Sequence, residues 1–438
     1  MARVVDEKIV AKCMEDAGIA DMSKASIREI AALVDSIQNV SGKEYIRMEL
    51  GVPGLPVPEI AVKAEIDALK AGVGAIYPNI NGIPSLKKEA SRFLKLFLNV
   101  EVDPKHCVPC VGSMQGGFAT MLTLSRFKKG RSGVLFLDPG FPVHMQQARV
   151  MGIPASTFDI YEYRGEKLRA KLEECVTTNN VACILYSNPN NPSWICLTDD
   201  ELKIIAEVAE KHDIVIIEDL AYFCMDFRKD YSKPGQPPYP STIAHYTDKY
   251  VLLVSSSKAF SYAGQRMGFI AISDNLAKAK SDTLREYYSW NELDKCLILG
   301  TLYALSSGTT HSVQYGFAAI LKAANDGEYN FVEQVREYGE KAHFMKKVFT
   351  DNGFRIVYDK DGDEPIADGF YFTVSYGNMN GADLLRNLLY YGVSAIGLRI
   401  TRSEHEEGLR VCVSMIRRNQ LDEFEKRIKA FNNEFGAK

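Results

Sequence analysis

The segment YVLLVSSSKAFSYAGQRMGFIAIS, residues 250–273, is the strongest indication of this chain's architecture. It contains two apolar runs, YVLLV and MGFIAIS, with Lys258 between them and Arg266 eight residues after that lysine. Both runs are apolar nearly throughout rather than alternating, which is typical of strands that helices cover on both faces. A lone lysine is nearly always a solvated surface charge. A lysine at the mouth of a buried strand, among small hydroxyl residues, therefore raises the question of function.

Similar apolar runs precede this segment, and helical patterns separate them. The runs are CVPCVG, GVLFLD, IPASTFDI, VACILYS and DIVIIED, between residues 107 and 219. The segment LTDDELKIIAEVAEKHD begins with a capping box, Thr198 and Glu201, and continues with helical spacing of its apolar residues. This alternation predicts an α/β fold with a mainly parallel seven-stranded sheet in a three-layer α/β/α large domain.

The two ends of the chain have different patterns. Residues 6–38 suit an N-terminal helix, and residues 45–60 form a Pro/Gly-rich connector. After about residue 325 a long helical stretch runs through Lys347, followed by the short strands FRIVY, GFYFTVSY, GVSAI and LRVCVSM. We therefore predict three regions: an N-terminal segment, 1–50, that packs with the small domain, a large cofactor-binding domain, 51–325, and a small α/β domain, 326–438.

Composition excludes several classes of protein. The 438 residues allow two or three core-sized units, and the formal net charge of -4 offers no basic footprint for nucleic acid. The sequence has no apolar stretch of about 18 residues that could span a membrane, and the N-terminus lacks the apolar core of a secretory signal. The nine cysteines, an odd number, fit reduced thiols in a cytoplasmic protein.

The segment HCVPC contains a single CxxC, Cys107 and Cys110. A zinc site needs more ligands at suitable spacing, and no second CxxC follows. We expect two strand cysteines here and no metal site.

Chemically useful residues collect where the predicted strands end, and ligands of open α/β sheets bind outside the carboxyl ends of the strands. Each feature has an ordinary structural interpretation: the glycine turn GSMQGG and the loop NPNNPSW as turns, Phe141 as core, Lys258 as a surface charge. Asp219, after IVIIE, needs a partner because an unpaired buried charge is costly. The convergence of these groups on one edge of one sheet favours a binding site.

The chain resembles the class I/II aminotransferases of the fold-type I pyridoxal-phosphate (PLP) enzymes. The matching motifs occur in the family's order across residues 51–415: YPNINGIPSLKKEA, GSMQGG, DPGFP, NPNNP, EDLAY, SSSKAFSYAGQRMG and GLRVCVSM. The spacing of S-x-S-K to the arginine is specific, and Asp219 and Tyr222 lie three residues apart upstream of it.

The resemblance implies roles in binding PLP. Lys258 would form the Schiff base with the cofactor and then move the proton between the substrate Cα and the cofactor carbon. Arg266 would bind the phosphate through its planar fork. The other phosphate ligands would be the hydroxyls of Ser255 and Ser257 and the backbone around Ser113 and Met114.

Four further residues would surround the cofactor ring. Asp219 would keep the pyridine nitrogen protonated, so that the ring accepts electrons from the substrate carbanion. Asn191 and Tyr222 would hydrogen-bond the phenolic oxygen and lower the basicity of the imine. Phe141 would stack on the ring.

The resemblance also implies how substrate and partner bind. Arg410 would bind the α-carboxylate of the substrate, with Gly51 and Asn191 close to it. Tyr77 would reach the phosphate of a neighbouring subunit, which implies a homodimer with shared active sites. The implied activity is transfer of an amino group between an α-amino acid and a 2-oxo acid, as part of amino-acid metabolism and biosynthesis.

The chain departs from the family pattern in two places. Ser193 and Trp194 follow the asparagine-proline pair where the family usually has threonine and glycine, which leaves the geometry of that loop open. Family members specific for dicarboxylates use an additional arginine. Arg285, Arg399 and Arg402 are candidates for it, and we interpret each as a surface charge.

Two alternative functions remain open at this stage. A PLP-dependent lyase, such as a C–S lyase or a decarboxylase, would use the same residues around the cofactor. A non-catalytic effector domain of a regulator would carry a DNA-binding domain before the α/β unit. The segment before residue 45 is too short for one, and the retention of Lys258 also speaks against that function.

Overall fold

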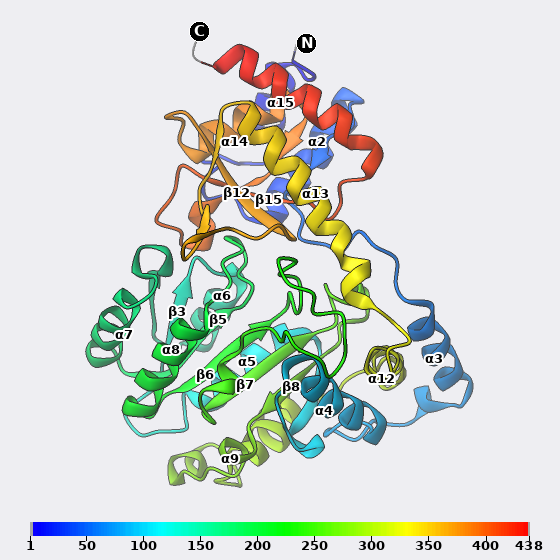
Figure 1. Cartoon of the computed structure of the whole chain (residues 1–438), viewed down its shortest axis with the longest axis vertical. Coiled ribbons are helices and arrows are strands. Elements are labelled where there is room, and N and C mark those ends of the chain that lie inside the picture. Colours follow the sequence, from blue (N-terminus) through cyan, green and yellow to red (C-terminus); the bar gives the residue numbers. More distant parts are fainter. Residues whose placement is uncertain (1–2, 437–438) are drawn as a thin grey trace.

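In the computed structural model, which describes residues 3–436, seven strands form one sheet in the order β2-β8-β7-β6-β5-β3-β4 (Figure 1). The pairs from β7 to β4 are parallel, and β8 is antiparallel to both β2 and β7. This confirms the predicted mainly parallel sheet. The strands are β2 (Cys107–Cys110), β3 (Gly133–Asp138), β4 (Ala155–Asp159), β5 (Val181–Ser187), β6 (Val215–Leu220), β7 (Tyr250–Ser255) and β8 (Gly268–Ile272).

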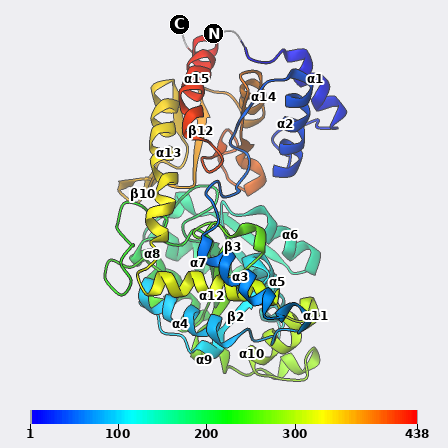
Figure 2. The ribbon, with the colours of Figure 1, turned by 90° about the vertical axis from the view of Figure 1, so that its right-hand side faces the viewer.

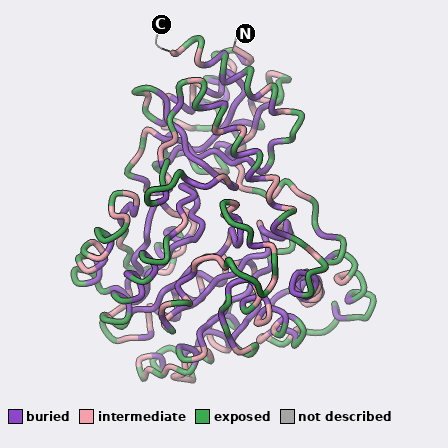
Figure 3. Tube along the Cα trace, in the orientation of Figure 1, coloured by how far each residue is buried: buried purple, intermediate pink, exposed green. Residues whose placement is uncertain are grey.

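Successive side chains of these strands belong to two separate cores. In β7, Leu252 and Val254 pack in one core, whereas Val251 and Leu253 pack in the other. Side chains of a strand point alternately to its two faces, so both faces of this sheet are covered. Figure 3 shows the strands as the most continuously buried part of the chain. The sheet is therefore the middle of three layers, as predicted.

Helices supply the outer layers. The core that contains Leu252 includes side chains of α4 (Pro84–Leu98), α7 (Lys167–Thr178), α8 (Asp199–His212) and α12 (His311–Asn325). The core that contains Leu253 includes side chains of α5 (Gly112–Leu124), α6 (Pro142–Met151), α9 (Asp274–Ala277), α10 (Leu293–Lys295) and the π-helix Cys296–Leu302, which continues into α11 (Tyr303–Ser306). Helix α8 begins with the predicted capping box of Thr198 and Glu201.

The C-terminal part forms a small domain around a four-stranded antiparallel sheet in the order β14-β15-β12-β9. Helix α13 (Phe331–Asp351) runs from the large domain into it (Figure 1). Its strands and other helices are β9 (Phe354–Ile356), β10 (Lys360–Asp361), β11 (Glu364–Pro365), β12 (Tyr371–Tyr376), α14 (Gly381–Tyr390), β13 (Val393–Ser394), β14 (Ile396–Gly397), β15 (Leu409–Cys412) and α15 (Leu421–Phe435).

The N-terminal segment lies against this small domain. Strand β1 (Ile46–Arg47) pairs in parallel with β13, and both chain ends lie at the same end of the molecule (Figure 1). The prediction of one helix over residues 6–38 was wrong, because two helices form, α1 (Glu7–Asp16) and α2 (Ile27–Ser41). Gly18, with φ 66°, ends the first, and a capping box of Ser26 and Glu29 begins the second. The boundaries at residues 50 and 325 remain predictions.

Short elements complete the description. Helix α3 (Glu59–Lys70) packs on α12, and one-turn 3-10 helices cover residues 73–75, 104–106, 160–163, 243–245, 263–265, 282–286, 398–401 and 418–420. None of the helices between residues 3 and 436 is both long and apolar enough to cross a membrane. All nine cysteines are free thiols, and Cys107 and Cys110 are buried in β2.

Candidate active site

The registers of the large sheet bring several chain segments to one edge. Ser187 pairs with Asp219 across β5 and β6, so the carboxyl ends of these parallel strands coincide. Ser255, the last residue of β7, pairs with Gly268, the first of β8, and Gly268 also pairs with Cys110 at the end of β2. Because β8 is antiparallel to its neighbours, its start lies at the same edge as their ends. Polar residues far apart in sequence therefore meet there.

The start of α5 and Arg266 form the first part of the site. Gly112 has φ 67°, and a Cβ atom there would lie 2.7 Å from Nη2 of Arg266, so only glycine lets the guanidinium reach the helix. Arg266 is exposed and donates Nη1–H to the carbonyl of Ala263 at 3.0 Å. The free N–H groups of a helix start and an adjacent guanidinium are suited to a phosphate.

Two hydroxyl residues and Lys258 lie at the end of β7, with Ser255 as its last residue and Ser257 and Lys258 just after it. The backbone N–H of Ser257 donates to Oγ of Ser255 at 3.2 Å, and both serines are buried. The ammonium of half-buried Lys258 donates to the carbonyl of Gly51. Burial lowers the pKa of Lys258 to about 8, and the nearby guanidinium of Arg410 acts in the same direction. A larger share of neutral amine at neutral pH makes this side chain a better nucleophile.

The carboxylate of Asp219 is buried and has one free oxygen. Its Oδ2 lies 3.1 Å from Nε2 of His144, and Oδ1 has no hydrogen-bond partner among the described residues. A buried carboxylate oxygen without a partner is costly, and a protonated ring nitrogen would satisfy it. His144 was not identified from the sequence. The signal available there was its position one helical turn after Phe141, whose ring it meets edge-on at 5.6 Å.

A pair of tyrosines stands next to the site, from two different domains. The hydroxyl of Tyr222 donates to that of Tyr371, in β12, at 3.0 Å. Burial raises the pKa of both phenols, which therefore keep their protons as donors. Tyr371 also limits space, because a Cβ on Gly51 would lie 2.1 Å from its hydroxyl. Sequence analysis did not identify Tyr371, whose strand pattern resembles that of an ordinary core residue.

Arg410 lies in β15 and is buried, with 1% of its surface exposed. It donates from Nη1 to Oδ1 of Asn191 at 3.3 Å and from Nη2 to the carbonyl of Glu49 at 2.5 Å, while Nε has no partner among the described residues. Its guanidinium carbon stands 4.5 Å from the centre of the Tyr371 ring. It forms no ion pair with Glu406 or Glu407. A buried guanidinium that no carboxylate neutralises is suited to an anionic ligand.

Trp194 is accommodated by a gap in the small domain. The residue is fully buried with φ 68°, and a Cβ on Gly369 would lie 2.0 Å from the indole ring. The indole packs edge-on against Tyr222 at 5.3 Å. The tight turn can contain the bulky Trp194 because Gly369 leaves room for the indole ring. Asn191 remains buried beside Arg410.

Three of the predicted cofactor residues lie at the surface or partly so. Tyr77 is 89% exposed, and no hydrogen bond joins its phenol to the described part of the chain. Met114 is also exposed, although its carbonyl accepts from the amide of Gln147 at 2.8 Å. Phe141 is half-buried and precedes α6. Within one subunit, Tyr77 is thus outside the cluster.

One of the three candidate arginines differs from its interpretation as a surface charge. Arg402 forms a bidentate ion pair with the buried carboxylate of Asp138, with both N–O distances 2.6 Å. This pair joins the small domain to the end of β3, so Arg402 is structural. Arg285 and Arg399 are exposed as expected, and Arg399 lies 3.5 Å from Glu406.

Comparisons with known proteins agree with this geometry. The family model described as aminotransferase class I and II matches residues 43–428. A probable aspartate aminotransferase of Methanocaldococcus jannaschii is 26% identical over 74% of this chain and 77% of its own. The aromatic-amino-acid aminotransferase 2 of Thermococcus litoralis is 29% identical over 76% and 78%. A double mutant of Thermus thermophilus aspartate aminotransferase has the same fold, with TM-score 0.75, 16% identity and coverage of 95% and 98%.

Proposed function

Because the chain belongs to the class I and II aminotransferases, which are PLP-dependent transaminases, we propose that Lys258 is its catalytic lysine. The observation that carries this proposal is the buried oxygen Oδ1 of Asp219, which has no hydrogen-bond partner within residues 3–436 and lies at the same sheet edge as Lys258. That oxygen needs a buried proton donor, and the protonated pyridine nitrogen of PLP is one.

The residues at the sheet edge fit the parts of the cofactor. Arg266, the start of α5 and the hydroxyls of Ser255 and Ser257 would hold the phosphate. Tyr222 and Asn191 would hydrogen-bond the phenolic oxygen. When bound, PLP supplies an electron sink for the electrons left at the substrate Cα.

The side chains of this protein would then perform three tasks. The amine of Lys258 would take the proton from the substrate Cα and hold it for return. Asp219, oriented by His144, would hold the ring nitrogen of the cofactor protonated. Arg410 binds both oxygens of the α-carboxylate and so orients the Cα–H bond beside Lys258. The lowered pKa of Lys258 suits its use as a base near neutral pH.

The substrates are an amino acid and a 2-oxo acid. The α-carboxylate beside the reacting carbon is common to all of them, and Arg410 recognises that group. Relatives are named as aspartate, aromatic-amino-acid and LL-diaminopimelate aminotransferases, which supports a role in amino-acid metabolism and biosynthesis. The free cysteine thiols support the cytoplasmic location that we predict.

We also propose a homodimer with shared sites. Helices α3 and α11 lie on the same side of the molecule (Figure 2), and both helices and the segment that contains Tyr77 carry exposed apolar side chains. Exposed large apolar side chains on neighbouring elements are typical of an interface. The exposed residues are Ile60, Val62, Ile66 and Leu69 of α3, Ile76 and Tyr77, and Tyr303 and Leu305 of α11.

The test of the catalytic lysine is reduction of the purified holoenzyme with borohydride. We expect the reduced cofactor on the peptide that contains Lys258. Lys258→Ala should retain PLP through the phosphate ligands and lose turnover by several orders of magnitude. Label on another lysine would refute the assignment.

A half-reaction separates transamination from a lyase activity, which the names of the relatives do not favour. With an amino acid alone, a transaminase converts PLP stoichiometrically to pyridoxamine phosphate and releases the matching 2-oxo acid. A lyase would turn over repeatedly and release a fragment of the substrate. Screening amino acids one at a time in this assay also identifies the donor.

A further inference from the structure

A buried carboxylate of the small domain contacts the loop that carries Asn191. Strands β10 and β11 form a hairpin between β9 and β12, and it lies where the two domains meet (Figure 2). Asp361 is the only buried residue of the hairpin, 360–365. Residues 361–364 line a cavity of about 690 Å³ at this boundary. The Asp361 carboxylate is therefore the buried attachment of the hairpin to the large domain, beside the more exposed contacts of Arg228 with Glu364 and the carbonyl of Pro365.

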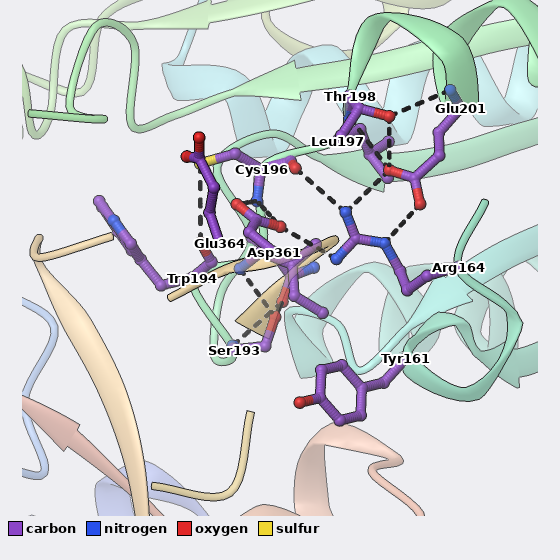
Figure 4. Close-up of polar contacts among 12 residues, drawn as sticks. Tyr161, Arg164, Ser193, Trp194, Cys196, Leu197, Thr198, Glu201, Asp361 and Glu364 are labelled. Atoms are coloured by element: carbon purple, nitrogen blue, oxygen red, sulfur yellow. Dashed lines mark hydrogen bonds and ion pairs between the residues drawn. The ribbon is translucent and has the colours of Figure 1, made fainter. Parts of the chain in front are cut away.

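Both oxygens of Asp361 accept hydrogen bonds from the large domain (Figure 4). Oδ1 accepts from Nη1 of Arg164 at 2.9 Å, and Oδ2 accepts from Nη2 of Arg228 at 2.9 Å. The backbone N–H of Cys196 donates to both oxygens, at 3.2 and 3.0 Å. Charge-assisted bonds of this kind are stronger than neutral ones and define geometry.

Each arginine is held in place by a second carboxylate of the large domain. Arg164 is bidentate on Glu201, which is also the capping-box residue of α8 (Figure 4). Arg228 is bidentate on Asp226. Because each arginine has its own carboxylate, removing the charge of Asp361 leaves no arginine unpaired. Asp361 is thus not required to neutralise the cluster, and the protein should fold without that charge.

The loop of residues 188–197 contacts the small domain at three points. Asn191 accepts from Arg410, Trp194 fills the gap at Gly369, and Cys196 donates to Asp361. The backbone N–H of Asn191 also donates to Oγ of Ser187 in β5 at 3.3 Å, so the large domain fixes the start of the loop. The contacts at both ends of Asn191–Cys196 make the small domain a second determinant of the position of the Asn191 amide.

We propose that Asp361 is a positioning residue, which anchors the loop of residues 188–197 to the small domain and so holds Asn191 against the cofactor. The inference rests on the role proposed above for Asn191. Asp361 does not touch substrate or cofactor. It acts through the Cys196 backbone.

The test compares Asp361→Asn with Asp363→Asn, a matched control on the exposed tip of the same hairpin. Asp361→Asn keeps the volume of the side chain but points an amide N–H group at the N–H groups that now donate to Asp361. We expect faster amide hydrogen exchange in the peptide 188–197 of the holoenzyme and little change elsewhere. We also expect the visible absorption of the Lys258–cofactor linkage to titrate with a higher pH midpoint. The proton affinity of the linkage should rise by up to about fivefold, which is the effect of one ordinary hydrogen bond. Asp363→Asn should change neither.

Asn191→Ala distinguishes the possible failures. If it shifts the midpoint but Asp361→Asn leaves both the loop exchange and the midpoint unchanged, the anchoring role is refuted and the proposed function stands. If Asn191→Ala leaves the midpoint unchanged, the proposed role of Asn191 fails and the inference fails with it. Faster exchange throughout the small domain without a shift of the midpoint would mean that Asp361 is merely structural, which also overturns the proposal.

Discussion

His144 Nε2 and Asp219 Oδ2 lie 3.1 Å apart beneath the sheet edge, and this contact leaves Oδ1 of Asp219 as a buried acceptor without a partner among the described residues. The hydrogen bond fixes the orientation of the carboxylate before any ligand binds. A preoriented, water-excluded acceptor is suited to keeping a bound ring nitrogen protonated.

The first prediction concerns this pair. Asp219→Ala should slow exchange of the substrate Cα proton with solvent by several orders of magnitude, because an unprotonated pyridine accepts electrons poorly. Asp219→Glu should be milder, since it keeps the charge and moves it. His144→Asn should cost roughly tenfold or less, because it removes only the orienting bond. Near-normal exchange in Asp219→Ala would contradict the role.

The second prediction concerns the amine of Lys258, whose pKa burial lowers to about 8. Only the neutral amine attacks the cofactor aldehyde, so the rate at which the apoprotein takes up PLP should rise about tenfold per pH unit below 8 and level off above it. A free alkylamine, measured alongside, should continue to rise to about pH 10. A protein rate that follows the alkylamine would show that Lys258 is not desolvated.

Tyr371→Phe removes one hydroxyl next to Tyr222 and leaves the ring beneath Arg410. The Tyr222 hydroxyl has one proton and donates it to Tyr371, so removal of that acceptor leaves the proton for the phenolic oxygen of the cofactor, and the proton affinity of the Lys258–cofactor linkage should fall by about two- to fivefold. The measurement is a pH titration of the visible absorption. Tyr376→Phe, on the same strand but bonded to Asn432, serves as the control and should leave the titration unchanged. Identical curves for both variants would rule out this role.

Arg410→Lys should keep the charge and lose the fork that binds both carboxylate oxygens. A shielded bidentate pair contributes about 3–5 kcal/mol, which corresponds to roughly a hundredfold to several-thousandfold in kcat/KM. Both the amino donor and the oxo-acid acceptor should be affected, while the PLP spectrum stays unchanged. Arg399→Lys, at an exposed position, is the control. If kcat/KM of Arg410→Lys falls less than tenfold, Arg410 is structural.

The last prediction tests the shared site. Tyr77→Ala should weaken retention of PLP, and Lys258→Ala should be inactive. Coexpression of the two variants forms some dimers in which one site combines an intact Lys258 with the partner chain's intact tyrosine at position 77. The mixture should therefore contain sites with full activity at limiting PLP. If PLP affinity in the mixture stays that of Tyr77→Ala alone, or if the protein is an active monomer, the sharing is refuted.

The sequence by itself determined the sheet and predicted which of its edges carries the candidate site. Strands buried on both faces are apolar throughout, so their number and their ends could be read from the chain, and Lys258, Asp219 and Arg266 stand at fixed offsets from those ends. Gly112, which opens GSMQGG, and the capping box at Thr198 are likewise local signals, because backbone conformation and helix termini depend on neighbouring residues.

Only the tertiary structure decided which side chains complete the site. His144 and Asp219 are 75 residues apart in the chain, Tyr222 and Tyr371 are 149 apart, and Asn191 and Arg410 are 219 apart. The break between α1 and α2 is marked by local signals, Gly18 and the capping box of Ser26 and Glu29, which the prediction of one helix over residues 6–38 did not use. Contacts such as Cys196 with Asp361 leave no trace in local periodicity, because packing of the two domains, and not the neighbours in sequence, determines which donor meets which acceptor.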